Sequence, residues 1–125
     1  MTKAILENTV NSFNQRQYKE AMHYSAEGLS FANGQDEAFW MGLNEVCEAY
    51  ELLERNQIAK AESKLVASME KLRNFGFRYQ NFEVTVALAG IRRALEEIRA
   101  VRGQSRKVFD VSIVPQFRLA AKADD

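Results

Sequence analysis

The sequence contains very few of the residues that cross-link or interrupt a polypeptide. Among its 125 residues are one cysteine, one proline, one histidine and six glycines. A single cysteine cannot form a disulfide within the chain, so the sequence does not require an oxidising compartment. The hydrophobic share of 46% excludes an intrinsically disordered chain, because such chains lack the apolar side chains that a core needs.

Long apolar segments are also absent. The longest weakly polar stretch covers residues 84–91, whereas a helix that spans a membrane needs roughly 20 apolar residues. The first residues do not combine a basic start with an unbroken apolar stretch, so a secretory signal is not expected. We therefore expect a cytoplasmic protein without a membrane partner.

The residues that are abundant are those that favour helices. Apolar side chains recur every three or four positions in five segments, at about residues 2–14, 17–32, 36–55, 58–75 and 82–102. The connections are short and polar, which makes consecutive helices antiparallel. The sequence therefore predicts an all-α fold, a five-helix bundle of antiparallel helical hairpins that forms one domain over residues 1–103. Residues 77–81 are expected to be a loop, with Asn81 capping the fifth helix.

Residues 104–125 differ from the rest of the chain. Their centre is rich in β-branched residues and is followed by Pro115, which disfavours helix in the residue before it. We expect an extended C-terminal tail that packs on the helical domain through four apolar anchors: Phe109, Val111, Ile113 and Phe117. The alternative is an edge strand that pairs with a second copy of the chain.

A weak internal repeat links the two halves of the helical domain. Three residues around the first polar turn are matched by three residues located 40 positions later: Phe13, Tyr18 and Ala21 by Leu53, Ile58 and Ala61. Two helical hairpins packed side by side explain this spacing. The region around Tyr18 and Ala21 also has the local character of a tetratricopeptide hairpin, although that repeat is about 34 residues long.

A second resemblance covers more of the chain. It rests on three groups of residues in order: Phe13-x4-Tyr18-x-Glu20-Ala21, then Phe39-x2-Gly42-Leu43, then Asn56-Gln57-x3-Ala61 with Leu65. Their order and spacing resemble the domain of unknown function 309 family, which consists of small all-helical prokaryotic proteins. The resemblance implies a helical fold. It implies no functional site, because the family's His-Glu-x-x-Glu motif is lost here: its positions hold Met22, His23 and Ala26.

The chain offers few residues for catalysis. His23 is the only histidine, and Cys47 lies on the apolar face of a predicted helix, where a buried and unreactive thiol is expected. No phosphate-binding glycine loop, Cys-x-x-Cys pair or nucleophile elbow is present. The absence of these motifs favours a protein that is not an enzyme, and no cofactor is predicted.

One spacing is compatible with metal binding. Glu20 and His23 lie three residues apart, as in the carboxylate-bridged metal sites of helix bundles. Glu48 and Glu51 from the next helix could complete a polar pocket between the second and third helices. Since such sites use a second histidine, which this chain lacks, solvated side chains are the simpler interpretation. A small-ligand or metal-binding protein or enzyme remains an alternative function.

Glutamates at three-residue spacing form an acidic row on the third helix: Glu45, Glu48, Glu51 and Glu54. Together with the polar Asn44, they predict a face that meets solvent or a partner rather than the core. On the same helix Phe39 and Trp40 are adjacent, so we expect one of them to face the core and the other to be exposed. An exposed Trp40 would anchor an interface, and Phe77 and Tyr79 are further candidates.

Charge is divided unevenly along the chain. Residues 1–70 hold 6 basic and 11 acidic side chains, and residues 71–125 hold 11 basic and 6 acidic ones. Six basic residues lie along the end of the fifth helix and in the tail: Arg92, Arg93, Arg99, Arg102, Arg106 and Lys107. We expect charge complementarity within the chain or between subunits, with Arg99 and Arg102 at an interface. A polyanion binder is the alternative, although aromatic residues that could stack on nucleic-acid bases are not interleaved with these arginines.

The favoured function is accordingly a non-enzymatic protein-interaction or scaffold module that forms a homodimer. The uneven charge and the candidate exposed aromatics both favour it. Nucleic acid is not an expected partner, since the formal net charge is zero.

Overall fold

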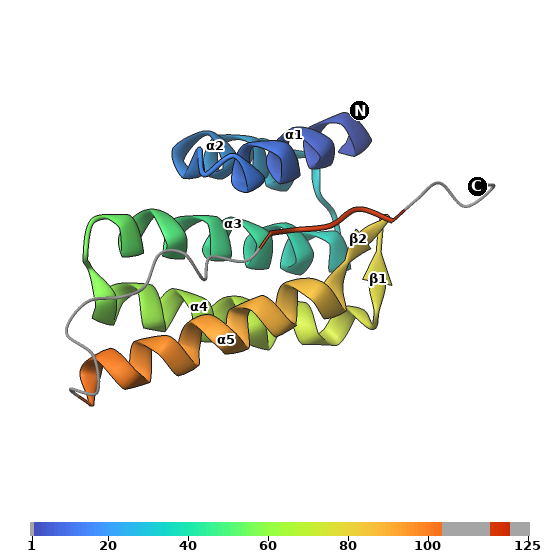
Figure 1. Cartoon of the computed structure of the whole chain (residues 1–125). Coiled ribbons are helices and arrows are strands. Elements are labelled where there is room, and N and C mark those ends of the chain that lie inside the picture. Colours follow the sequence, from blue (N-terminus) through green and yellow to red (C-terminus); the bar gives the residue numbers. More distant parts are fainter. Residues whose placement is uncertain (1, 104–115, 121–125) are drawn as a thin grey trace.

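The structure, a computed structural model, describes residues 2–103 and 116–120. Within these residues it is all-α apart from one tiny hairpin, as the sequence predicts. Figure 1 shows the elements in chain order: α1 (Thr2–Asn14), α2 (Tyr18–Phe31), α3 (Gln35–Glu54), α4 (Ile58–Leu72), a 3₁₀ turn (Arg73–Phe75), β1 (Arg78–Tyr79), β2 (Phe82–Glu83) and α5 (Val84–Arg102). No helix in the described residues has the length and apolar character needed to cross a membrane.

The helices α1 and α2 form one antiparallel hairpin, and α3 and α4 form a second one. The turns of the two hairpins have the same backbone conformation. Arg16 and Asn56, which lie 40 residues apart, end the first helix of each hairpin with φ angles of 63° and 59°. The amide of the following glutamine returns to the helix in both turns, from Gln17 to the Ser12 carbonyl and from Gln57 to the Leu52 carbonyl, each at 2.9 Å. These are Schellman-type helix ends. The predicted 40-residue repeat is therefore a repeat of the turn itself.

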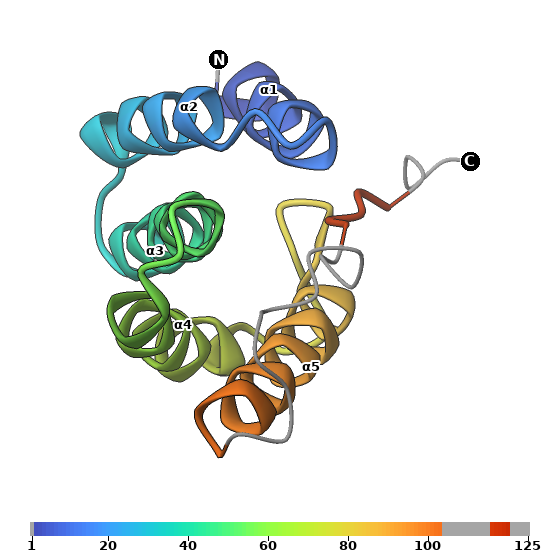
Figure 2. The same cartoon turned by 60° about the vertical axis from the view of Figure 1, so that its left-hand side comes forward.

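The helix α3 lies at the centre of the molecule, between the α1–α2 hairpin on one side and α4 and α5 on the other (Figure 2). This position corrects the expectation for Phe39 and Trp40. Both are buried, with 0% and 1% of their surface exposed. Phe39 packs against the aromatic rings of Phe75, Tyr79 and Phe82. Because α3 is covered on two sides, adjacent residues of this helix both find partners, and Trp40 cannot anchor an interface.

The expected loop at residues 77–81 is instead the centre of a two-stranded antiparallel hairpin in which Tyr79 pairs with Phe82 and Arg78 with Glu83. Its two turn residues, Gln80 and Asn81, have φ angles of 50° and 67°, the combination that a two-residue hairpin turn requires. Asn81 is therefore a turn residue and not the helix cap that the sequence predicts. The residue that precedes α5 is Glu83, whose side chain forms no cap hydrogen bond.

Residues 116–120 lie against the end of α1 and against β2. They are therefore close to the beginning of α5 and far from its C-terminal end, where the preceding described residues lie (Figure 1). In Figure 2 this segment, drawn in red, runs beside the hairpin and between α1 and α5. Phe117 is 97% buried, so this predicted anchor is confirmed. The other three predicted anchors, at positions 109, 111 and 113, lie outside the described residues.

Candidate functional site

The residues around Phe117 form a narrow aromatic slot. The ring of Phe117 stacks on Phe13 of α1, with 3.7 Å between ring centroids and an interplanar angle of 6°. The ring of Phe82 in β2 meets Phe117 edge-on at 5.2 Å. Aromatic pairs in these geometries stabilise by about 0.5–1.5 kcal/mol beyond the burial of their area. The slot therefore holds an aromatic side chain by contacts from α1 and from β2.

The side chain of Asn14, the last residue of α1, forms two hydrogen bonds to the backbone of Phe117. Its carbonyl oxygen accepts a hydrogen bond from the Phe117 amide at 2.8 Å. Its amide nitrogen donates to the Phe117 carbonyl at 3.0 Å. A primary amide used in this way offers the same donor and acceptor as a neighbouring β-strand. Since both bonds go to main-chain atoms, they favour an extended backbone at this position whatever side chain is present.

Residues 118–120, which follow Phe117, pair with β2. The Glu83 amide donates to the Arg118 carbonyl at 2.9 Å, and the Ala120 amide donates to the Asn81 carbonyl at 2.6 Å. Phe82 thereby faces Leu119 in an antiparallel bridge. One edge of β2 is already paired with β1, so residues 118–120 occupy the other edge. We call the site formed by Phe13, Asn14, Asn81, Phe82 and Glu83 the docking groove, and residues 116–120 the docked segment.

Two further aromatic rings, those of Tyr18 and Tyr50, pack against Phe13 of the docking groove. Phe13 also meets Tyr18 and Tyr50 edge-on, at 5.3 and 5.2 Å. Both tyrosines are buried, and within the described residues neither hydroxyl has a hydrogen-bond partner. Burial raises the pKa of Tyr18 to about 12, and burial also raises the pKa of Tyr50. The floor of the groove is therefore an uncharged aromatic layer, which suits the binding of apolar side chains and offers no acid–base group near neutral pH.

The four candidate metal ligands are not brought together. Glu20 and Glu51 line a hollow of about 220 Å³ beside the α1–α2 turn, but His23 and Glu48 do not belong to its lining. Glu20 and His23 are exposed on α2. Among the described residues there is no cluster of three or more His, Cys, Asp or Glu side chains that could hold a metal ion. The Glu-x-x-His spacing therefore does not assemble a site with the third helix.

The acidic row of α3 is mostly paired within the chain. Glu45 and Glu48 are half-buried and Glu51 is buried, so the prediction that the row meets solvent or a partner rather than the core is corrected for Glu51 and fits best at Glu54, which is exposed. Three of its four glutamates form ion pairs: Glu45 with Lys71 at 3.0 Å, Glu48 with Lys64 at 3.5 Å, and Glu51 with Arg55 at 3.1 Å. Two of these cations belong to α4, so the row joins the two helices of the second hairpin. At least one member of each pair keeps contact with solvent, and surface ion pairs contribute about 0–1 kcal/mol each.

Asn44 has a similar internal role. Its amide nitrogen donates to the Met22 carbonyl at 3.0 Å and to the Ser25 hydroxyl at 2.9 Å, both in α2. The polar side chain therefore connects the two helical hairpins. Asn44 is half-buried, so its main role is a contact between helices that the prediction of a solvent- or partner-facing position did not include. A polar residue in the sequence does not distinguish a solvated site from a hydrogen bond between helices.

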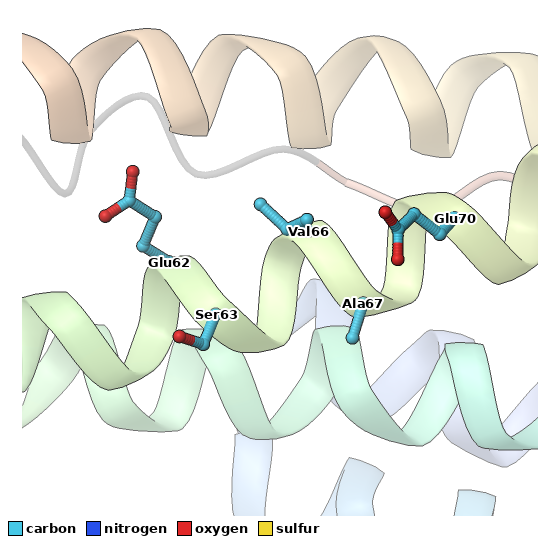
Figure 3. Close-up of a pocket in the computed structure, with 5 residues that line it drawn as sticks. All are labelled: Glu62, Ser63, Val66, Ala67 and Glu70. Atoms are coloured by element: carbon cyan, nitrogen blue, oxygen red, sulfur yellow. The ribbon is translucent and has the colours of Figure 1, made fainter.

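The two arginines of α5 that were predicted at an interface, Arg99 and Arg102, have different surroundings. Arg102 forms an ion pair with Glu62 of α4, whereas Arg99 is exposed and forms no ion pair within the described part of the chain. Together with the Lys71–Glu45 pair, the Arg102–Glu62 pair joins the basic and acidic halves, as predicted. Glu62 also lines a hollow of about 380 Å³ along α4, and Figure 3 shows Glu62 and Val66 projecting from that helix towards α5. The predicted cations at positions 106 and 107 lie outside the described residues.

The two remaining aromatic candidates differ in accessibility. Phe77 is 84% exposed. Tyr79 is half-buried, its ring lies 4.9 Å from Phe39, and its hydroxyl donates a hydrogen bond to the Asp36 carboxylate. Tyr79 thus attaches the hairpin to the start of α3, and only Phe77 offers a largely free apolar surface.

Comparison with protein-family models, with curated proteins and with solved structures finds no match to this chain. The resemblance to the domain of unknown function 309 family therefore stays a prediction. The docking groove itself was not predicted: of its residues, the sequence singles out only Phe13, as part of a repeat, and Asn81, as a helix cap. Asn81 in a hairpin turn was the one signal that could have located β2.

Proposed function

We propose that this protein is a non-enzymatic protein-interaction module that holds an extended peptide segment in the docking groove. The proposal rests on one observation, the pair of hydrogen bonds between the Asn14 side chain and the main chain of residue 117, one donated and one accepted by Asn14. Main-chain bonds along a strand edge provide affinity in β-augmentation, and a pocket for alternate side chains provides specificity. The docking groove has both components, in Asn14 with β2 and in the aromatic slot.

A peptide supplied in solution tests this proposal. The probe is a fluorescein-labelled synthetic peptide with the sequence of residues 114–122. The protein is the full chain carrying Phe117→Ala and Leu119→Ala, which we call the double-alanine variant and which removes the two apolar side chains of the docked segment. Fluorescence anisotropy is expected to show saturable binding, because the groove residues are unchanged and their occupant is weakened.

Two further variants identify the site of binding. Adding Asn14→Ala to the double-alanine variant is expected to reduce peptide affinity at least about tenfold, the effect of losing hydrogen bonds worth about 1.4 kcal/mol. Adding Asn11→Ala instead is the matched control, since Asn11 lies on the same helix but is exposed. Absence of peptide binding to the folded double-alanine variant, verified by circular dichroism, would show that the proposal is wrong.

The homodimer expected from the sequence is proposed to use the same contact. A segment that one chain holds in its own groove can occupy the groove of a second copy with the same bonds, as in domain swapping. Light scattering would then show a dimer fraction that rises with protein concentration and disappears in the double-alanine variant. A monomer at every concentration contradicts the homodimer and leaves the peptide-binding function standing.

The other functions considered from the sequence have less support. The hollow that contains Glu20 and Glu51 also contains Arg16 and Lys19, which compete with a metal ion for the carboxylates. The polyanion alternative retains the exposed Arg99 but loses Arg102 to its ion pair with Glu62. A cytoplasmic location stays part of the proposal.

A further inference from the structure

We infer that the docked segment is a built-in competitor, which a partner protein must displace by presenting an extended segment of the pattern aromatic–any–aliphatic. This inference rests on the proposed function and adds the chemistry of the partner and its regulation. The observations that carry it are the register of the docked segment, its main-chain bonds and its covalent attachment to the groove that it fills.

The register of the docked segment on β2 determines which of its side chains contact the groove. Phe117 is buried in the aromatic slot, Arg118 is exposed, and Leu119 is half-buried opposite Phe82. Side chains of an extended segment alternate between two faces, so positions 117 and 119 face the groove and position 118 faces away. A partner therefore needs an aromatic residue and, two positions later, an aliphatic one, with no requirement on the residue between them.

The main-chain bonds add a second requirement. Amide hydrogens of residues 117 and 120 donate to Asn14 and to the Asn81 carbonyl. Proline has no amide hydrogen, so a partner with proline at the aromatic position or three positions after it loses one of these bonds. The groove thus selects for extended segments that have no proline at the aromatic position or three positions after it.

Competition follows from the attachment of the docked segment to the same chain. A tethered segment faces its groove at an effective concentration on the order of mM. If a free peptide of the same sequence binds an empty groove with a dissociation constant of about 10–100 μM, the occupied groove binds it about 10- to 100-fold more weakly. The wild-type chain is accordingly a weak binder until the docked segment leaves.

The experiment compares three full-length proteins for binding of the labelled 114–122 peptide: the wild type, the double-alanine variant and Arg118→Ala. The double-alanine variant is expected to bind about 10- to 100-fold more tightly than the wild type. Arg118→Ala is the matched control, since this exposed side chain faces away from the groove, and it should bind as the wild type does. Equal affinity of the wild type and the double-alanine variant would overturn the inference of competition. Failure of every protein to bind would instead overturn the proposed function.

Variant peptides test the pattern on the double-alanine protein. Alanine in place of the peptide's phenylalanine or leucine, and proline at the position of Ala120, are expected to lower affinity at least about tenfold. Alanine in place of the arginine should leave it unchanged. Equal binding of all four peptides would overturn the aromatic–any–aliphatic pattern.

A measurement on the wild type keeps the inference testable if the double-alanine variant does not fold. Trypsin is expected to cleave after Arg118 only when the backbone at this position is released from Glu83, whose amide donates to the Arg118 carbonyl in the docked state. Saturating unlabelled peptide, with its own arginine replaced by alanine so that it is not a substrate, should accelerate cleavage at Arg118 as followed by mass spectrometry. An unchanged rate at peptide concentrations that saturate binding would show that the docked segment is not displaced.

Discussion

The fit between Gly28 and Trp40 shows how closely the two helical hairpins approach at a single residue. A Cβ atom placed on Gly28 of α2 would lie 2.4 Å from Cε3 of the Trp40 ring. No real Cβ contact is this short, so the indole occupies the space that any other residue at position 28 would fill. The burial of Trp40, which sequence reasoning did not expect, depends on the absence of a side chain in another helix.

Gly28→Ala tests this contact. Helix propensity alone favours alanine over glycine by about 1 kcal/mol. Since the new methyl would overlap the indole, we expect a net loss of about 1–3 kcal/mol in the free energy of unfolding. Urea denaturation measures it. The same substitution in a Trp40→Phe background should cost less, because the smaller ring leaves room, and a stabilising Gly28→Ala would contradict the packing described.

The burial of Cys47 makes a prediction about the reactivity of its thiol. The thiol is fully buried, and burial raises its pKa, so the reactive thiolate is suppressed in the folded protein. We expect no reaction with a thiol-specific reagent such as dithionitrobenzoate in buffer at pH 8 and stoichiometric reaction in 6 M guanidinium chloride. Prompt labelling of the native protein would show that the site opens.

At the scale of elements, the helices could be predicted and the hairpin could not. The predicted helix at residues 17–32 is Tyr18–Phe31, and that at 36–55 is Gln35–Glu54, because apolar periodicity over four or five turns averages out individual exceptions. Each strand has only two residues, too few for an alternating pattern to be visible. The docking groove combines residues 13–14 with residues 81–83, and no local pattern reports that these segments meet.

The Asn14 contact between α1 and the docked segment makes a prediction about local opening. Asn14→Ala removes two hydrogen bonds, each worth about 0.5–1.5 kcal/mol. We expect trypsin to cleave after Arg118 several-fold faster in this variant, because the segment spends more time away from β2. Asn11→Ala should cleave at the wild-type rate. Wild-type cleavage in Asn14→Ala would mean that Asn14 does not hold the segment.

At the scale of the whole molecule, ion pairs and aromatic packing connect parts that are distant in sequence. The Glu45–Lys71 and Glu62–Arg102 pairs join the acidic and basic halves, which the charge distribution alone could suggest. The aromatic layer of Phe13, Tyr18 and Tyr50 joins α1, α2 and α3, and composition could not reveal that two of its hydroxyls have no partner in the described residues.

Those hydroxyls predict how stability depends on pH. Tyrosine in an unfolded chain has a pKa of about 10, and burial raises the pKa of Tyr18 to about 12. The folded state therefore keeps a proton that the unfolded state loses between these values. This contribution to stability is complete below about pH 10 and is lost as the pH rises to about 12, with a slope of at most about 1.4 kcal/mol per pH unit for each such tyrosine.

Urea denaturation at several pH values between 8 and 11 measures this slope. The variant with Tyr18→Phe and Tyr50→Phe should lose stability less steeply than the wild type above pH 10, because the removed hydroxyls no longer titrate. The lysines are the same in both proteins and cancel in the comparison. Parallel pH profiles would contradict the burial of these hydroxyls.

The contact between Asn14 and Phe117 joins residues that are 103 positions apart, whereas the helical hairpins pack helices that are consecutive along the chain, as in the Lys71–Glu45 contact across 26 positions. Local contacts form in microseconds to milliseconds, and distant ones wait for the chain to close a long loop. All five helices can therefore be assembled before the aromatic slot is filled. Under the proposed function, this order of folding would leave the groove complete and vacant for an interval, and a partner could bind each new molecule before its own segment fills the groove.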